Sequence, residues 1–367
     1  MSLPRIRAYL RERIEEALDP FEDVPEDFEV ALERPAESEH GDLATNTAMK
    51  LASALGRSPR SIAEDLAERL ENDLLDPDWI ASVEVAGPGF INFRFADAYL
   101  RGALAEILDE GDAYGRSDQG RGQRALVEYV SANPTGPLTV GHGRNAVLGD
   151  TLANVYEWLG YAVTREYYYN DAGRQMRVLA ESVRARYRAI VNPEEGTRTL
   201  TLDDEEVEVP AQFPEDGYLG AYIVEIAEEL AEEHGGDLLE EDDLEVFKKA
   251  AEEAIFSEIE GTLARLGVEM DSFFNERDLY EDGRIWDVVD RLEEAGLVYE
   301  KEGARWLETS AFGKDKDTVL VKSSGEPTYR LPDIAYHADK IERGFDRILD
   351  VFGADHIDTI PDVINAV

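Results

Sequence analysis

The chain has 367 residues, more than one hydrophobic core normally serves, so two or three domains are expected. Hydrophobic residues make up 43% of the sequence, which is enough to form such cores. There is no cysteine, which excludes disulfides, thiolate zinc sites and a cysteine nucleophile.

Acidic residues dominate the charge. The 81 Asp and Glu outnumber the 37 Lys and Arg and leave a formal net charge of -44, which ordinarily argues against a nucleic-acid partner. The excess is either plain solvated surface or a halophilic adaptation to molar salt, where screening removes self-repulsion. No stretch approaches the ~20 apolar residues that span a bilayer, and the amino terminus has no apolar signal core. A cytoplasmic protein without membrane contact is therefore expected.

Residues 1–115 predict a small α/β domain. An amphipathic pattern indicates a helix over Leu3–Leu18, and further helical patterns cover 46–72. Alternation of apolar residues indicates a strand near Phe28–Leu32 and a hairpin over Val83–Phe95, turned at a Gly-Pro-Gly sequence.

Residues 116–190 predict the first half of a doubly wound, Rossmann-type parallel sheet. A strand at Ala125–Val130 is followed by a Pro/Gly loop and a helix from about His142 to Leu159. A second strand at Ala162–Tyr169 and a helix over 172–190 complete a pattern typical of α/β proteins.

The remaining residues are expected to form an insertion and then to continue the Rossmann-type domain. Residues 191–319 alternate acidic loops and helices and are expected to form a connective insertion. Residues 320–367 contain short apolar strands at 320–323 and 347–352, and are expected to begin the second half of the same domain.

The loop Ser131–Arg144, SANPTGPLTVGHGR, leaves the first parallel strand at its carboxyl end, where open α/β sheets bind ligands. Its glycines allow close backbone approach, and the first-turn amides of the next helix form an anion site. His142 lies in that turn and can donate a hydrogen bond to a phosphate oxygen. The alternative is a simple turn whose histidine caps or packs.

This loop resembles the signature of class I aminoacyl-tRNA synthetases, and its form N-P-T-G-P-L-x-V-G-H-x-R resembles the arginyl-tRNA synthetases. Thr139 stands where that family has its first signature histidine, whereas His142 retains the second. Further matching blocks lie at Gly41–Ala52, Val85–Phe93, Gly149–Met176, Leu266–Phe274 and Tyr329–Arg347.

The resemblance implies ATP-dependent ligation of L-arginine to tRNA(Arg) through an arginyl-adenylate, with Mg²⁺ accompanying ATP. It implies no metal site made by the protein alone. The residues implied in catalysis and ATP binding are Asn133, Pro134, Thr139, Gly141, His142, Gly143, Asp355 and His356. The motif around Asp355 and His356 departs from the family at the next three residues.

Arginine binding requires anions, because a guanidinium presents a planar fork of donors that a carboxylate meets in two places. The resemblance implies that Asp333 holds the guanidinium beside Tyr329, and that Glu128, Ser131 and Asn133 contact the amino acid. Without the resemblance, Asp333 could simply favour a helix start after a proline. Glu128 could likewise be an exposed strand residue.

Residues 1–115 and several arginines are implied in tRNA contact. Arg5 and Arg11 lie on the first predicted helix, and Arg174 and Arg177 lie on the helix that follows Asp171. The alternative is that these arginines balance neighbouring glutamates. Since salt weakens phosphate contacts, recognition by shape, stacking and 2′-hydroxyls is expected.

Family members continue to a lysine-bearing signature loop and an anticodon-binding domain, so a truncated chain, monomeric and with impaired activity, is expected. Relatives that lack that loop place a lysine where this chain has Gly136. Two other functions remain open: a free-standing nucleotidyltransferase with the same phosphate loop, and a non-catalytic tRNA-binding remnant.

Overall fold

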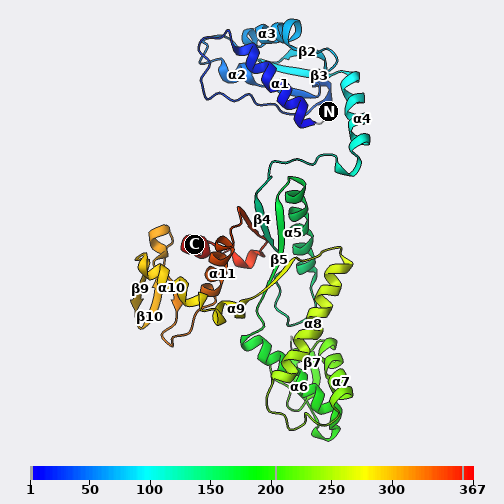
Figure 1. Cartoon of the computed structure of the whole chain (residues 1–367), viewed down its shortest axis with the longest axis vertical. Helices are drawn as coiled ribbons and strands as arrows, with labels where there is room; N and C mark the ends of the chain where they lie inside the picture. The colour runs from blue at the N-terminus through cyan, green and yellow to red at the C-terminus, as the bar shows by residue number, and fades with distance from the viewer. Residues whose placement is uncertain (1–2, 203–204, 358) are drawn as a thin grey trace. The chain divides into compact units, whose positions relative to one another are not determined.

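The computed structural model describes residues 3–202, 205–357 and 359–367, and divides into two compact units, Met1–Arg116 and Ser117–Val367 (Figure 1). Among these residues, no helix is both long enough and apolar enough to cross a bilayer. The side chains that lie outside the description are those of Leu3, Pro4, Glu195, Leu202, Glu205 and Asp355.

The first unit packs helices against a three-stranded antiparallel sheet of order β1-β3-β2. The helix α1 buries Ile6, Leu10 and Ile14, which are spaced to share one face. The elements are α1 (Leu3–Leu18), β1 (Leu43–Thr45), α2 (Thr47–Leu51), α3 (Pro59–Arg69), β2 (Ile80–Ala86), β3 (Phe90–Phe95) and α4 (Asp97–Glu110).

The predicted hairpin is present as β2 and β3, but the predicted strand near Phe28–Leu32 is wrong. That segment makes only an isolated bridge, between Glu33 and Ala44. Its apolar side chains Phe28, Val30 and Leu32 pack on the core of the unit instead of joining the sheet. Burial alone therefore explains their alternation.

The second unit contains a four-stranded parallel sheet of order β12-β4-β5-β8, so the predicted α/β fold is confirmed. In β4 the side chains of Ala125, Leu126 and Val127 are fully buried, as expected for a central strand covered on both faces. The elements are β4 (Arg124–Glu128), α5 (Val140–Trp158), β5 (Ala162–Tyr169), α6 (Gly173–Val191), β8 (Ser272–Asn275) and β12 (Arg347–Asp350).

The structure places part of residues 191–319 inside the sheet, because β8 pairs with β5. The preceding elements form a hairpin and a helical group on α6: β6 (Thr197–Leu202), β7 (Glu205–Pro210), α7 (Ala221–His234) and α8 (Glu245–Arg265).

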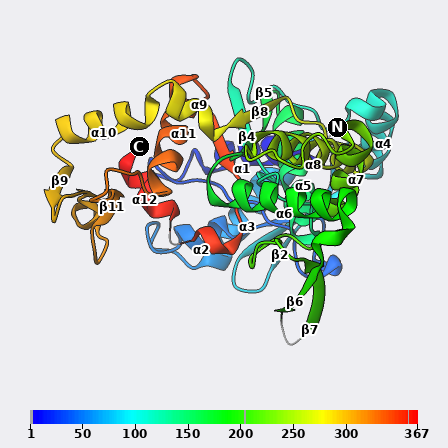
Figure 2. The same ribbon diagram turned by 90° about the horizontal axis from the view of Figure 1, so that it is seen from below.

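The strand expected at 320–323 is β11, and it joins a separate antiparallel sheet of order β11-β10-β9 instead of the parallel one. In both views α11 lies between this sheet and the parallel sheet (Figure 1, Figure 2). The remaining elements are α9 (Glu276–Glu281), α10 (Arg284–Glu294), β9 (Val298–Lys301), β10 (Ala304–Leu307), β11 (Thr318–Val321), α11 (Arg330–Glu342) and α12 (Ile360–Ala366). Short helical turns occur at Ser38–His40, Leu70–Leu74, Gly111–Ala113, Pro193–Glu195, Thr309–Phe312 and Ala354–His356.

Candidate active site

The chain makes a sharp bend as it leaves β4. Val130 and Ser131 have φ angles of 68° and 44°, in the left-handed region that non-glycine residues rarely adopt. Such a conformation costs about 1–3 kcal/mol per residue and persists only where surrounding contacts enforce it. The bend turns Ser131 back, so that its hydroxyl donates to Glu128 Oε1 at 2.8 Å and accepts the Tyr168 N–H at 3.2 Å.

The following residues of the loop are tied to neighbouring elements. Tyr167, fully buried in β5, donates its hydroxyl proton to the Ala132 carbonyl at 2.7 Å. Asn133 Oδ1 accepts the Asn170 N–H at 3.0 Å, and its amide donates to Gln175 at 3.1 Å. These contacts fix Asn133 at the carboxyl end of β5, beside the start of α6.

The start of α5 orients His142 through a reciprocal capping arrangement. Thr139 is the N-cap residue, and its hydroxyl accepts the His142 N–H at 3.4 Å. The His142 Nδ1 atom in turn accepts the Thr139 N–H at 3.1 Å. Because Nδ1 is an acceptor, neutral His142 carries its proton on Nε2, which remains available as a donor.

The glycines of this turn leave room for a ligand. A Cβ atom placed on Gly143 would meet nothing within 4 Å, and one on Gly141 would meet only Thr139 Oγ1 at 3.4 Å. Gly136 is different, because a Cβ there would lie 2.9 Å from the Tyr222 hydroxyl, which bonds the Thr135 carbonyl. A side chain at position 136 therefore requires the Tyr222 ring to shift.

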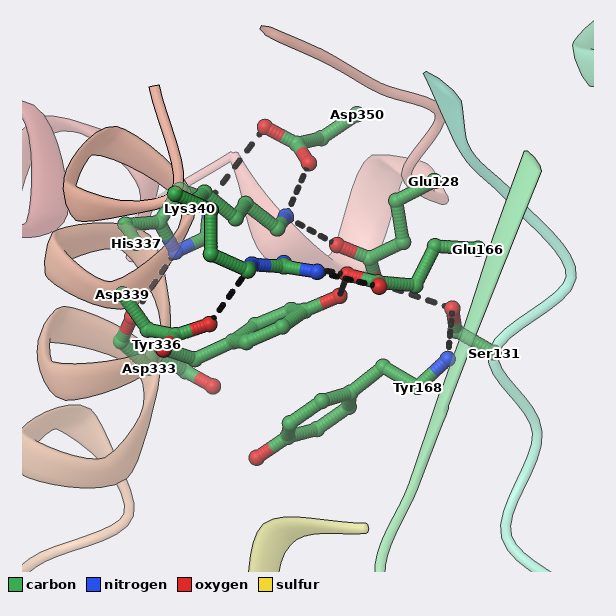
Figure 3. Close-up of polar contacts among 11 residues, drawn as sticks. Glu128, Ser131, Glu166, Tyr168, Asp333, Tyr336, His337, Asp339, Lys340 and Asp350 are labelled. Atoms are coloured by element: carbon green, nitrogen blue, oxygen red, sulfur yellow. Dashed lines mark hydrogen bonds and ion pairs between the residues drawn. The ribbon is translucent and has the colours of Figure 1, made fainter. Parts of the chain in front are cut away.

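Glu128, at the end of β4, is 3% exposed and forms an ion pair with the fully buried Lys340 of α11 (Figure 3). Lys340 also bonds Asp350 of β12 and lies 4.0 Å from the centre of the Tyr336 ring. Burial opposes the charge of Lys340, but the two carboxylates outweigh it and raise its pKa. The alternative of an exposed Glu128 is therefore excluded.

A second buried carboxylate lies beside Glu128 in register. Glu166 of β5 is fully buried and accepts two hydrogen bonds of 2.7 Å from the Arg343 guanidinium and one from the Tyr336 hydroxyl. Although burial works against its ionised form, these donors lower the pKa of Glu166. Lys340 of α11 thus provides a cation for the end of β4, and Arg343, the residue directly after α11, provides one for the adjacent β5.

Asp333, in the first turn of α11, faces the same edge of the sheet (Figure 3). Burial raises its pKa to about 6, and the carboxylates Glu276 and Glu128 add to this effect, whereas His337 and His356 oppose it. Glu276, the first residue of α9, accepts the Tyr168 hydroxyl proton at 2.7 Å. Asp333 and Glu276 therefore place two like charges near each other.

Two residues of this region, Glu276 and Lys340, were not among those expected from the sequence. Glu276 directly follows β8, where the carboxyl ends of parallel strands meet, but β8 lies within residues 191–319, for which the sequence predicts an insertion. Lys340 shares a helix face with Asp333 and Tyr336 by its i, i+3 and i+7 spacing, a signal that was available.

Other predicted site residues have varied surroundings. Tyr329 is 70% exposed, and its ring centre lies 5.3 Å from Cζ of the Arg330 guanidinium. Pro134 is buried. His356 stacks on Phe352 at 5.0 Å, and the side chain of the predicted Asp355 lies outside the described residues.

The arginines implied in tRNA contact are exposed, and three of them have partners within the chain. Arg174 bonds Asp216 at 2.5 Å, and Arg177 lies 4.0 Å from Glu181. Arg11 donates to the Val30 carbonyl at 3.3 Å, and Arg5 is exposed. In the described part of the chain, no three histidine or carboxylate side chains are grouped as metal ligands would be.

Comparison with known families decides the relationship. Residues 6–95 match the family described as arginyl tRNA synthetase N terminal domain. Residues 103–359, well over half of the chain, match the family described as tRNA synthetases class I (R), catalytic domain. The chain belongs to the arginyl-tRNA synthetase family. The resemblance carried by the signature loop is thereby confirmed.

Individual relatives of this chain agree with the family assignment. It is 62% identical over 363 residues to an arginine–tRNA ligase of Salinibacter ruber, covering 99% of this chain and 64% of the relative. It is 50% identical to that of Desulfotalea psychrophila, covering 92% of this chain and 57% of the relative. The chain therefore spans about three fifths of these relatives' length.

A solved structure shows the same fold. Arginyl-tRNA synthetase of Thermus thermophilus superimposes with a TM-score of 0.59 at 24% identity, covering 90% of this chain and 52% of the other.

Proposed function

We propose that this chain catalyses ATP-dependent activation of L-arginine and its transfer to tRNA(Arg). The observation that carries the proposal is that two carboxylates, Asp333 and Glu276, lie near enough to interact electrostatically, and that Glu276 bonds Tyr168 of β5. In that neighbourhood Lys340 bonds Glu128 and Asp350, and Arg343 bonds Glu166. Neither cation bonds Asp333 or Glu276 among the described residues. Two neighbouring carboxylates of this kind suit a guanidinium.

The guanidinium of arginine would lie against Asp333 and Glu276, with Tyr329 beside it. A planar fork of N–H donors meets carboxylates in two places, and the bonds are strengthened by charge. The raised pKa of Asp333 reflects the cost of burying its charge beside other carboxylates. A bound guanidinium relieves that cost, so the pocket favours a cation over a neutral analogue.

The amino-acid end of arginine would face Ser131, Asn133 and Glu128. ATP would lie over the first turn of α5, where Gly141 and Gly143 leave space for the phosphates and the backbone amides favour anions. Magnesium would enter with ATP as part of the substrate and balance phosphate charge.

The reaction would proceed by direct displacement. An oxygen of the arginine α-carboxylate attacks the α-phosphorus, the bond to the β-phosphate oxygen breaks, and pyrophosphate leaves with the electron pair. His142 Nε2–H donates to a phosphate oxygen as charge builds there. A ribose hydroxyl at the tRNA end then attacks the arginyl carbonyl and releases AMP. Positioning and charge stabilisation are the catalytic contributions.

The tRNA would be bound with help from the first unit, whose residues 6–95 match the family's amino-terminal domain. Arg5 and Arg11 of α1 and Arg174 and Arg177 of α6 are the proposed contacts. We place this activity in the cytoplasm and propose a monomer.

Binding of L-arginine, measured by isothermal titration calorimetry, tests the pocket. Asp333→Asn and Glu276→Gln are expected to weaken binding at least about tenfold, the value of one charged hydrogen bond. Glu281→Gln, an exposed change on the same helix α9, is the matched control and keeps wild-type affinity.

A second ligand sharpens this test. L-Citrulline, which carries a neutral urea group in place of the guanidinium, should not bind the wild-type chain. Equal affinity for arginine and citrulline would rule out a charge-selective pocket. Arginine-dependent ATP–pyrophosphate exchange with tRNA(Arg) present, abolished by Asp333→Ala, tests the chemistry itself.

A further inference from the structure

Asn145, on the second turn of α5, makes two hydrogen bonds to main chain on either side of the candidate site. Its Oδ1 accepts the Val130 N–H at 2.8 Å. Its Nδ2 donates to the Val351 carbonyl at 2.7 Å. Because a backbone N–H can only donate and a carbonyl can only accept, the orientation of this amide is fixed by its partners.

The first bond holds the bend after β4. Val130 is a β-branched residue at φ 68°, a conformation it does not adopt without external contacts. Ser131, next in the chain, has its hydroxyl on Glu128 because of that bend. Asn145 therefore supports the part of the site proposed to hold the amino-acid end of arginine.

The second bond holds the end of β12. Val351 also donates its N–H to the Glu128 carbonyl at 2.9 Å, which continues the parallel pairing of β12 with β4 by one residue. Phe352 and His356 follow, stacked on each other at 5.0 Å. His356 is one of the residues that the family resemblance implies in ATP binding. Asn145, on the helix that carries His142, therefore contacts main chain in both the arginine half and the ATP half of the proposed site.

We infer that Asn145 is a positioning residue that couples the arginine half of the site to the ATP half. The inference depends on the proposed function in taking arginine and ATP as the ligands. The two hydrogen bonds of Asn145 do not depend on it. Asn145 touches no reacting atom. It acts by holding the Val130–Ser131 bend and the Val351 segment in one arrangement relative to the first turn of α5.

Two substitutions separate the two bonds. Asn145→Asp keeps an acceptor for the Val130 N–H but loses the donor to Val351, and it sets a carboxylate oxygen against that carbonyl. Asn145→Ala loses both bonds. Asn154→Asp makes the same chemical change on the exposed face of α5 and serves as the matched control.

Titration calorimetry with L-arginine and with MgATP is the first measurement. Asn145→Asp is expected to weaken the binding of MgATP about tenfold and to leave the affinity for arginine within about twofold of wild type. Asn145→Ala is expected to weaken the binding of both ligands about tenfold. Asn154→Asp is expected to match the wild type. The inference would be overturned if Asn145→Asp lost affinity equally for both ligands, or if neither variant lost affinity for either ligand.

Amide hydrogen exchange at Val130 is the second measurement and needs no ligand. Protection is expected in the wild type and in Asn145→Asp, and loss of protection in Asn145→Ala. If Asn145→Ala keeps the Val130 amide protected, the inference fails. If instead the wild-type chain binds no arginine while the exchange pattern holds, the proposed function fails and the positioning role of Asn145 stands.

Discussion

Glu128 and Lys340 form a buried ion pair between β4 and α11, with 2.5 Å between Oε2 and Nζ and neither side chain more than 3% exposed. Lys340 also meets Asp350, so one ammonium serves two carboxylates from adjacent parallel strands. The pair anchors α11, which carries Asp333, against the sheet edge at which Ser131 bends back. The geometry of the proposed arginine pocket thus depends on a residue that does not line it.

Replacing Lys340 with Met is expected to destabilise the chain by about 3–5 kcal/mol, because it leaves Glu128 and Asp350 buried without their cation. Urea denaturation followed by circular dichroism measures the change. Lys322→Met is the control: Lys322 is exposed, so a change within about 0.5 kcal/mol is expected. A Lys340→Met chain as stable as wild type would show that the pair contributes nothing.

Arginine affinity is expected to depend on pH through Asp333. Its pKa of about 6 means that the carboxyl is increasingly protonated below that pH and must lose its proton to hold a guanidinium. Affinity should therefore fall up to about tenfold per pH unit below 6 and level off above about 7. Calorimetry across this range measures it, and Asp333→Asn should show weak binding without that dependence.

The same raised pKa predicts that Asp333 lowers the stability of the ligand-free chain at neutral pH. Its pKa is above the ordinary value of 3.8, so its favourable contribution is present below that value and is lost as the pH rises through about 6. Asp333→Asn should raise the free energy of unfolding by about 1–2 kcal/mol at pH 8 and leave it almost unchanged near pH 4. A variant that is less stable than wild type at pH 8 would contradict this prediction.

Gly149 is expected to tolerate no side chain. A Cβ atom there would lie 2.1 Å from Cγ of the fully buried Tyr129, which cannot move because it is fixed between β4 and the Val130 bend. Gly149→Ala should therefore cost about 2–3 kcal/mol. Gly261→Ala, in α8, meets only the end of Arg265 at 3.7 Å and should be neutral or stabilising by up to about 1 kcal/mol. Thermal melts of the two variants make the comparison.

The net charge of -44 predicts a dependence of stability on salt. At molar KCl the Debye length is about 3 Å, and repulsion among surface carboxylates is screened; at about 0.1 M it is about 10 Å. The melting temperature should therefore fall steeply as KCl is diluted over that range. A melting temperature indifferent to KCl would favour the simpler interpretation of a solvated acidic surface.

The sequence by itself determined the local features and the family. The alternation of apolar residues located β2 and β3, the glycines and His142 located the turn into α5, and the ordered blocks identified the arginyl-tRNA synthetases. These properties depend on residues close together in the chain, whose periodicity and turn chemistry act without long-range contacts. The strand expected near Phe28–Leu32 failed for the same reason, since an alternating pattern reports burial and not pairing.

The tertiary structure alone decided which distant residues meet. Lys340 lies 212 positions from Glu128, Asn145 lies 206 from Val351, and Tyr168 lies 108 from Glu276. No local pattern predicts such pairs, because they form only when the parallel sheet aligns the ends of β4, β5, β8 and β12 at one edge. Burial at that edge removes water from the carboxylates, and this desolvation makes each of them require a cation, a donor or a raised pKa.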